Sequence, residues 1–267
     1  MYKSTIANVR VLELALFLFC LPFATATPIF SPTCGAGSNN IPDAVVDNVG
    51  ITTPGVLSCG FVVNTPGIVA PGNAITVGLL GFIHEASGDL IVTLTHYTDA
   101  SKTVIFGASQ TLFYRIGKTS ADPNDFGYSA QFGDLFGGEN YTFNSGFTTN
   151  LWTIASHLGS ADFIPGAAAG FTSGYTTHGP FSSTPNTFSA LFAGQPIGGY
   201  WELNITDNAA GPSAPSVAGS LLQFSLDINS AMIVPEPGSW VLCALGLLGM
   251  ALPGVKRYTS SPRIRKN

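Results

Sequence analysis

The side chains that could carry chemistry in this sequence are few, and their spacing limits what they could do. The four histidines, His84, His96, His157 and His178, are scattered, and none stands in a His-x-x-x-His or His-Glu-x-x-His arrangement that would bind zinc. The sequence also has no Gly-x-Ser-x-Gly elbow and no phosphate-binding loop. We therefore predict no catalytic residues and a non-enzymatic protein. A carboxylate pair for glycoside hydrolysis stays open as an alternative, with no residues that single it out.

Cysteine usage predicts one disulfide. Of the four cysteines, Cys20 and Cys243 lie in apolar segments near the two ends, which leaves Cys34 and Cys59 in the central part. Two cysteines in an exported domain usually pair, because compartments outside the cytoplasm are oxidising. A metal site is the alternative, but no histidine is close to either cysteine in the sequence and the spacing matches no zinc motif.

The densest acidic patch is Asp122-Pro123-Asn124-Asp125, which Asp134 and Glu139 follow. Oxygen ligands at alternating positions of a turn suit Ca²⁺, so Asp122, Asn124 and Asp125 are candidate calcium ligands. The alternative, which we favour, is a solvated loop in which Asp and Asn only shape turns. We predict no other metal and no cofactor.

Aromatic residues crowd the stretch from Phe126 to Trp152, interleaved with Gly, Asn and Thr. Exposed aromatic rings on a sheet can stack against sugars, which makes exopolysaccharide a candidate partner. The alternative is that most of these rings fill the core of a second sheet. The aromatic residues of this stretch are Phe126, Tyr128, Phe132, Phe136, Tyr141, Phe143, Phe147 and Trp152.

The elements that would position these residues are strands. Residues 74–82, 90–96, 103–106 and 200–206 are rich in β-branched or aromatic residues and are bounded by turn formers, and no long stretch has helical periodicity. Residues 161–185, rich in Gly, Ala and Thr, are expected to form a long surface loop. The pattern predicts an all-β sandwich or barrel.

Alternation within two of the segments predicts which side chains are buried. In residues 90–95, Leu90, Val92 and Leu94 would share one face of a strand. In residues 221–228, one face would hold Leu222, Phe224, Leu226 and Ile228.

Charge separates the central part of the chain from its ends. Residues 27–234 hold three of the ten Lys and Arg and thirteen of the fifteen Asp and Glu, which gives a formal net charge of −10. Nucleic acids and anionic lipids need a basic face, so we predict that this part binds neither.

The N-terminus has the features of a secretory signal peptide. Residues 1–10 include Lys3 and Arg10, and the mainly apolar run 11–23 follows. Ala24 and Ala26 then supply small residues at the two positions that signal peptidase reads, so we place cleavage after Ala26, before Thr27. The alternative is an uncleaved N-terminal anchor. Either way, the Sec machinery and signal peptidase are expected partners and the central part is exported.

The C-terminus combines a short motif, an apolar run and a basic end. Pro235-Glu236-Pro237 precedes the uncharged segment 239–255, and Lys256 and Arg257 close that segment. Seventeen residues at helical rise reach about 25 Å, the short end of what spans a bilayer. Positive charges directly after the segment should hold this end in the cytoplasm. We predict a transmembrane helix over 239–255 and a basic cytoplasmic tail over 256–267.

This tripartite end resembles that of PEP-CTERM proteins of Gram-negative bacteria. In that family the tail is a sorting signal that a membrane-embedded exosortase processes near the Pro-Glu-Pro motif. The resemblance implies a precursor anchored in the inner membrane with a periplasmic domain, which is then sorted to the cell envelope or secreted. An ordinary single-pass anchor with a proline-rich linker is the alternative.

Two segments within the exported part resemble the P domain (Homo B domain) of kexin- and furin-like subtilases. Residues 75–94 include His84 and Gly88-Asp89-Leu90 between two strands, and residues 198–226 include Trp201, Leu203 and Asp207 in the family's Gly-x-Trp-x-Leu-x-Val-x-Asp pattern. The resemblance implies a jelly-roll-like β-sandwich. Tyr97–Lys102 replaces the family's Ser-Pro-x-Gly-Thr turn and Gln223-Phe224 stands where a Trp is usual, so we carry over no ligand site.

The residues of these motifs also have a purely structural interpretation. Trp201 and Leu203 can fill the core from one face of a strand. Asp89 and Asp207 can accept main-chain N–H bonds at strand ends and shape turns, and His84 can fix a turn.

Together these features predict six segments. They are a signal peptide (1–26), a Pro/Gly-rich strip (27–55), a β-sandwich (56–230), a linker with the Pro-Glu-Pro motif (231–238), the transmembrane helix (239–255) and the basic tail (256–267). We expect a non-enzymatic protein of the envelope or extracellular matrix. A carbohydrate- or calcium-binding adhesion module and a P-domain-like stabiliser of a separate partner are the alternatives.

Overall fold

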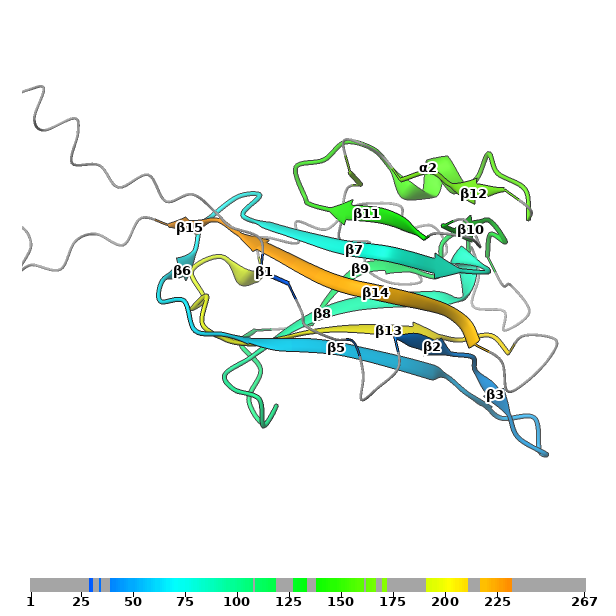
Figure 1. The fold of residues 1–267 in the computed structure, drawn as a ribbon, viewed down its shortest axis with the longest axis horizontal. Helices are drawn as coiled ribbons and strands as arrows, with labels where there is room; N and C mark the ends of the chain where they lie inside the picture. The colour runs from blue at the N-terminus through cyan, green and yellow to red at the C-terminus, as the bar shows by residue number, and fades with distance from the viewer. Residues whose placement is uncertain are drawn as a thin grey trace, which may run out of the picture. The chain divides into compact units, whose positions relative to one another are not determined.

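The chain folds as two facing β-sheets (Figure 1). The computed structural model describes residues 29–30, 34, 39–107, 109–118, 127–133, 138–160, 162–166, 170–171, 191–210 and 217–231. The predicted signal peptide, the Pro-Glu-Pro motif, the segment 239–255 and the basic tail lie outside these residues. Within them, the structure has no helix that is long and apolar enough to cross a bilayer.

The large sheet is built around the two longest strands, β7 (Ile75–His84) and β14 (Val217–Ile228), which pair antiparallel. The free edge of β14 takes β1 (Ile29–Phe30) and β2 (Asn40–Pro42). The free edge of β7 takes β11 (Glu139–Phe143) and β10 (Gln131–Phe132), and β10 in turn pairs in parallel with β12 (Phe163–Ile164). The strip 27–55 thus supplies two strands to this sheet.

The small sheet has four antiparallel strands in the order β5, β13, β8, β9. Their bounds are Gly55–Val63 for β5, Gly199–Asp207 for β13, Leu90–Tyr97 for β8 and Gln110–Tyr114 for β9. Two further pairs of short strands complete the strand set, β3 (Val45–Val46) with β4 (Thr52–Thr53) and β6 (Ile68–Val69) with β15 (Ser230–Ala231). Within the described residues, helical structure is limited to short elements such as η1 (Ser87–Asp89) and α2 (Leu151–Ala155).

Aromatic side chains fill the space between the two sheets. Near one edge Phe61 of β5 meets Phe224 of β14, with ring centroids 5.2 Å apart. Near the other, Phe113 of β9 lies 5.4 Å from Phe132 of β10 and 5.6 Å from Phe143 of β11. Contacts from both edges of the small sheet to the large one confirm that the all-β fold is sandwich-like. As predicted, the inward faces of β8 and β13 are buried, with Leu90, Val92, Leu94, Trp201 and Leu203 fully inside.

One residue of β14 departs from the predicted alternation. Phe224, Leu226 and Ile228 face the core, but Leu222 is 65% exposed and Leu221 is buried instead. The cause lies on the neighbouring strand, where Gly81 of β7 adopts φ +60° opposite Leu222. This left-handed residue interrupts the pleat, so the inward-facing positions change phase there in both strands.

Two further expectations are corrected. Residues 103–106 form no strand; Ile105 makes an isolated bridge with Tyr97 in the loop that follows β8. Residues 161–185 are not simply a surface loop, because Phe163–Ile164 form β12 and both Ile164 and Phe171 are fully buried. A single apolar pair within a Gly-rich stretch gives too little periodicity to indicate a strand.

Candidate functional site

The disulfide predicted from cysteine usage is present. Cys34 and Cys59 are bonded to each other, and both are completely buried. Cys59 lies on β5 of the small sheet, whereas Cys34 lies between β1 and β2, which pair with the large sheet. The bond therefore connects the N-terminal strip of the large sheet to an edge strand of the small one.

The other predicted site residues contribute no described geometry. Asp122, Asn124 and Asp125, the candidate calcium ligands, lie outside the described residues, as do Ala24, Ala26 and Thr27 at the predicted signal cleavage site. The motif residues Pro235, Glu236 and Pro237 and the basic residues Lys256 and Arg257 also lie outside them. Among the described residues, no three His, Cys, Asp or Glu side chains come together in a way that could hold a metal ion.

The aromatic stretch supplies mainly core. Phe132, Tyr141 and Phe143 are fully buried. The Tyr141 hydroxyl donates to the carbonyl of Ile164 at 2.7 Å and accepts from the N–H of Gly133 at 2.8 Å, and burial raises its pKa. Trp152 and Tyr128 pack against the core from its edge. These five rings therefore lie in the core or pack against it, while Phe147 is partly exposed and Phe126 and Phe136 lie outside the described residues.

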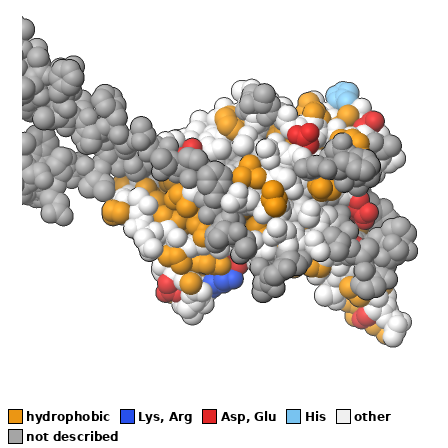
Figure 2. All heavy atoms as spheres, viewed as in Figure 1, with side chains coloured by type: hydrophobic (Ala, Val, Ile, Leu, Met, Phe, Trp, Pro, Cys, Tyr) orange, Lys and Arg blue, Asp and Glu red, His pale blue; other side chains and the backbone are white. Residues whose placement is uncertain are grey.

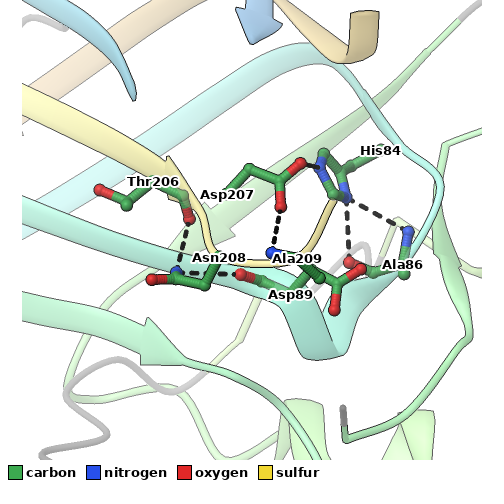
Figure 3. A network of polar contacts seen from close by, with 7 residues as sticks. All are labelled: His84, Ala86, Asp89, Thr206, Asp207, Asn208 and Ala209. Atoms are coloured by element: carbon green, nitrogen blue, oxygen red, sulfur yellow. Dashed lines mark hydrogen bonds and ion pairs between the residues drawn. The ribbon is translucent and has the colours of Figure 1, made fainter. Parts of the chain in front are cut away.

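A first polar cluster lies at the ends of strands β7 and β13 (Figure 3). We call it the end cluster; its members are His84, Asp89, Asp207 and Asn208. His84 Nε2 lies 3.3 Å from Asp207 Oδ2, and each of the two side chains is about 1% exposed or less. His84 Nδ1 lies 2.9 Å from the carbonyl oxygen of Ala86 and 3.2 Å from its nitrogen. Nε2 thus faces the Asp207 carboxylate, and Nδ1 faces the main chain of the turn after β7.

The remaining contacts of the end cluster also hold main-chain turns. Asp207 Oδ1 accepts from the N–H of Ala209 at 3.0 Å. The Asn208 side chain donates to the carbonyl of Asp89 at 3.1 Å and to that of Thr206 at 3.2 Å. The structural roles predicted for His84 and Asp207 are confirmed. Asp89 differs from the prediction, because it accepts through its main-chain carbonyl.

The Asp89 carboxylate is the member of the end cluster whose ionised form is disfavoured by its surroundings. Burial, followed by the nearby Asp207 carboxylate, raises the pKa of Asp89 to about 6, against an ordinary value of 3.8. His84 and Arg115 oppose the shift. Ionised Asp89 is therefore an energetic cost that the fold carries at neutral pH.

A His–Asp pair of this kind invites comparison with a catalytic dyad, but its geometry does not suit chemistry. Both nitrogens of the His84 ring are engaged, and the residue is 1% exposed, so it cannot reach a substrate proton. The nearby hydroxyl of Ser87 is itself buried and donates to the carbonyl of Tyr128 at 3.2 Å. The contacts of the end cluster hold the turns at the ends of β7 and β13.

The second polar cluster lies on the outer face of the small sheet, and the sequence analysis missed it. We call it the tyrosine face; its members are Tyr97, Lys102, Tyr200, Glu202 and Asn204. Glu202 is only 4% exposed although it points away from the core, because Lys102 reaches over it with Nζ 2.5 Å from Oε1. The Lys102 side chain itself is 41% exposed.

Comparison with known proteins shows no family for this chain. No family model matches it, and no curated protein sequence does either. Among solved structures, a serine protease of Aeromonas sobria is similar at 14% identity, over 82% of this chain and 29% of the protease chain, with a TM-score of 0.36. The same protease in complex with its chaperone ORF2 gives a TM-score of 0.32 with the same identity and coverage. This chain spans under a third of either protease chain, and at these scores the likeness carries no argument.

Proposed function

We propose that this chain is a non-enzymatic protein that is exported, held temporarily in the inner membrane and then sorted to the cell envelope or released. Residues 1–26 direct export, the β-sandwich is the functional body, and residues 235–267 act as a sorting signal of the PEP-CTERM type that an exosortase processes. An ordinary single-pass anchor is the competing function of the same tail.

The observation that supports export best is the disulfide between Cys34 and Cys59. Both cysteines are completely buried, and their bond connects the strip of strands β1 and β2 to strand β5. Disulfides of this structural kind persist in oxidising compartments and are rare in the cytosol. On the face drawn in Figure 2, the described surface carries scattered acidic side chains and a basic group among mainly uncharged atoms.

The finer fold within the sandwich is proposed to be jelly-roll-like, as in P domains. This is supported by the end cluster, where three residues of the two P-domain-like motifs meet. His84 and Asp89 come from the first motif and Asp207 from the second, and they lie at the ends of adjacent turns. That the domain has no catalytic activity is supported by the burial of His84 and Asp207.

The sorting proposal is tested by the fate of the tail. In a host that makes the protein naturally, the wild type should leave the inner membrane, and its C-terminus should map near Pro235–Gly238. A variant with Pro235→Ala and Pro237→Ala should accumulate uncleaved in the inner membrane, whereas Pro54→Ala, at an exposed proline far from the motif, should behave as wild type. Wild-type protein that stays in the inner membrane with Asn267 intact would show an ordinary anchor and refute sorting. Full-length protein in the cytosol would refute export.

A further inference from the structure

The tyrosine face is an ordered array in which the register of two strands fixes every neighbour. Trp201, Leu203, Ile205 and Asp207 point inward from β13, so the alternate residues Tyr200, Glu202 and Asn204 point outward. The β8 register places Tyr97 beside Tyr200, Thr95 beside Glu202 and Thr93 beside Asn204.

The two tyrosines form a ring platform at one end of this array. Their ring centroids are 6.3 Å apart with the ring planes inclined at 50°, and both residues are partly exposed. The Tyr200 ring extends over Gly60 of β5. A Cβ at residue 60 would collide with the hydroxyl and the end of this ring. Side chains on a strand normally stand up from the sheet. The absence of a side chain at residue 60 therefore lets this ring reach over the neighbouring strand and broaden the platform.

The charged pair beside the platform is neutral as a unit. The Glu202 carboxylate accepts from Lys102 Nζ and from the Tyr97 hydroxyl, and burial, followed by Glu202, raises the pKa of Tyr97. Lys102 Nζ also lies 5.4 Å from the centre of the Tyr200 ring. An ammonium has three N–H donors. Lys102 therefore keeps donors beyond the one used by Glu202, and they face solvent at the edge of the tyrosine rings.

The middle of the array offers uncharged hydrogen-bonding groups. Ser58 of β5 donates to Asn204 Oδ1 at 2.5 Å, which fixes the amide so that Nδ2 is left as the donor. Thr93 and Thr206 are partly exposed, whereas Thr95 is buried and its hydroxyl pairs with that of Ser109 at 2.6 Å. From Tyr200 to Asn204 the strand runs about 13 Å, at roughly 3.3 Å per residue.

We propose that the tyrosine face binds a neutral glycan. The C–H face of a sugar ring stacks on Tyr200 with the inclined Tyr97 ring beside it, while the sugar hydroxyls take hydrogen bonds from Lys102 Nζ and Asn204 Nδ2 and give them to the hydroxyls of Thr93 and Thr206. Apart from the compensated Lys102–Glu202 pair the array is uncharged, and the exported part carries a net charge of −10, which disfavours anionic polysaccharides. About 13 Å of strand accommodates a short oligosaccharide. This site goes beyond export and sorting, because a sorted protein need not bind sugar.

The test uses the protein as the cell exports it, purified in mild detergent. The probes are laminarihexaose, cellohexaose, maltohexaose and mannohexaose as neutral glycans and oligogalacturonate as the anionic comparator, with affinity measured by isothermal titration calorimetry. At least one neutral probe should bind. Tyr200→Ala and Asn204→Ala should each weaken that binding tenfold or more, and Tyr200→Phe should retain it within about threefold because the ring remains.

The matched control is Phe163→Ala, which removes a 38%-exposed aromatic ring from the large sheet. It should leave the affinity within twofold of wild type. If Tyr200→Ala does not fold, the glycan affinities of Asn204→Ala and Phe163→Ala are compared instead. Binding of none of the neutral probes, preferential binding of oligogalacturonate, or equal losses in Asn204→Ala and Phe163→Ala would each overturn the proposal.

Discussion

The end cluster and the tyrosine face each include side chains of strand β13, yet the two clusters differ in where their hydrogen bonds go. In the end cluster, the side chains of His84, Asp207 and Asn208 form hydrogen bonds with one another or with main-chain groups of turns. On the tyrosine face, Lys102 and Asn204 each contact one neighbour, both side chains are at least partly exposed, and each has further N–H donors. A cluster made of typical catalytic residue types can thus be scaffolding, while ordinary surface residues form the better candidate for recognition.

The largest expected contrast comes from two substitutions on the same strand. Asp207→Ala removes the acceptor of buried His84 and of the turn at Ala209, so we expect it to lower the free energy of unfolding by about 3 kcal/mol. Asn204→Ala, on the opposite face of β13, should cost about 1 kcal/mol or less. Urea unfolding at pH 7.5 measures both. Equal losses would mean that the two clusters contribute equally to the free energy of unfolding.

A smaller effect, with a pH signature, is expected from Asp89→Asn. The pKa of Asp89 is raised to about 6 in the folded protein, so the folded state holds this proton more tightly than the unfolded state does. Stability is therefore greatest below the ordinary pKa of 3.8 and falls as pH rises through 6. Asn cannot ionise, so the variant should be more stable than wild type by about 2 kcal/mol at pH 7.5.

The same variant supplies its own control at low pH. At pH 4 Asp89 is protonated in the folded protein, and the difference in unfolding free energy between the variant and wild type should nearly vanish. Melting curves at both pH values measure the effect. If the difference in unfolding free energy between the variant and wild type is the same at pH 7.5 as at pH 4, the Asp89 carboxylate is not in an unfavourable environment.

On the tyrosine face, Lys102→Met should have a modest cost. It leaves the 4%-exposed Glu202 carboxylate without its cation, so we expect a loss of about 1–2 kcal/mol. Adding Glu202→Gln to Lys102→Met removes the uncompensated charge and should recover part of this loss. Unfolding of the two variants in parallel tests the pairing, and no recovery in the double variant would argue against it.

The smallest expected effect is that of Tyr200→Phe. The hydroxyl is the only group lost, and the ring still covers Gly60, so the free energy of unfolding should change by less than about 0.5 kcal/mol. Thermal melts are sufficient to measure this. A large loss would place the Tyr200 hydroxyl in the scaffold and bring the two clusters closer in character.

Much of the scaffold could be predicted because its signals are local. Runs of β-branched and aromatic residues between turn formers identified β8 and β13, alternation in residues 90–95 identified the buried face of β8, and the two central cysteines identified the disulfide. Leu222 was assigned to the wrong face because its orientation depends on the conformation of Gly81 on another strand. Alternation within one segment carries no information about such a partner.

The tyrosine face could not be predicted as a unit, because strand register brings its members together. Tyr97 and Tyr200 become neighbours only through the pairing of β8 with β13, and Lys102 reaches Glu202 from a loop. A partial signal was available in the polar half of β13, where Tyr200, Glu202 and Asn204 alternate with the buried Trp201, Leu203 and Ile205. The His84–Asp207 pair was likewise present only as two separate turn signals.

The central claim, an oxidised and exported sandwich with a removable tail, is tested most directly by the intact mass of the protein recovered from the envelope or the medium, with and without reduction. We predict an N-terminus at Thr27, a C-terminus near Pro235–Gly238, and a gain of two hydrogens on reduction as the Cys34–Cys59 bond opens. A mass equal to the whole chain from Met1 to Asn267, unchanged by reduction, would contradict it.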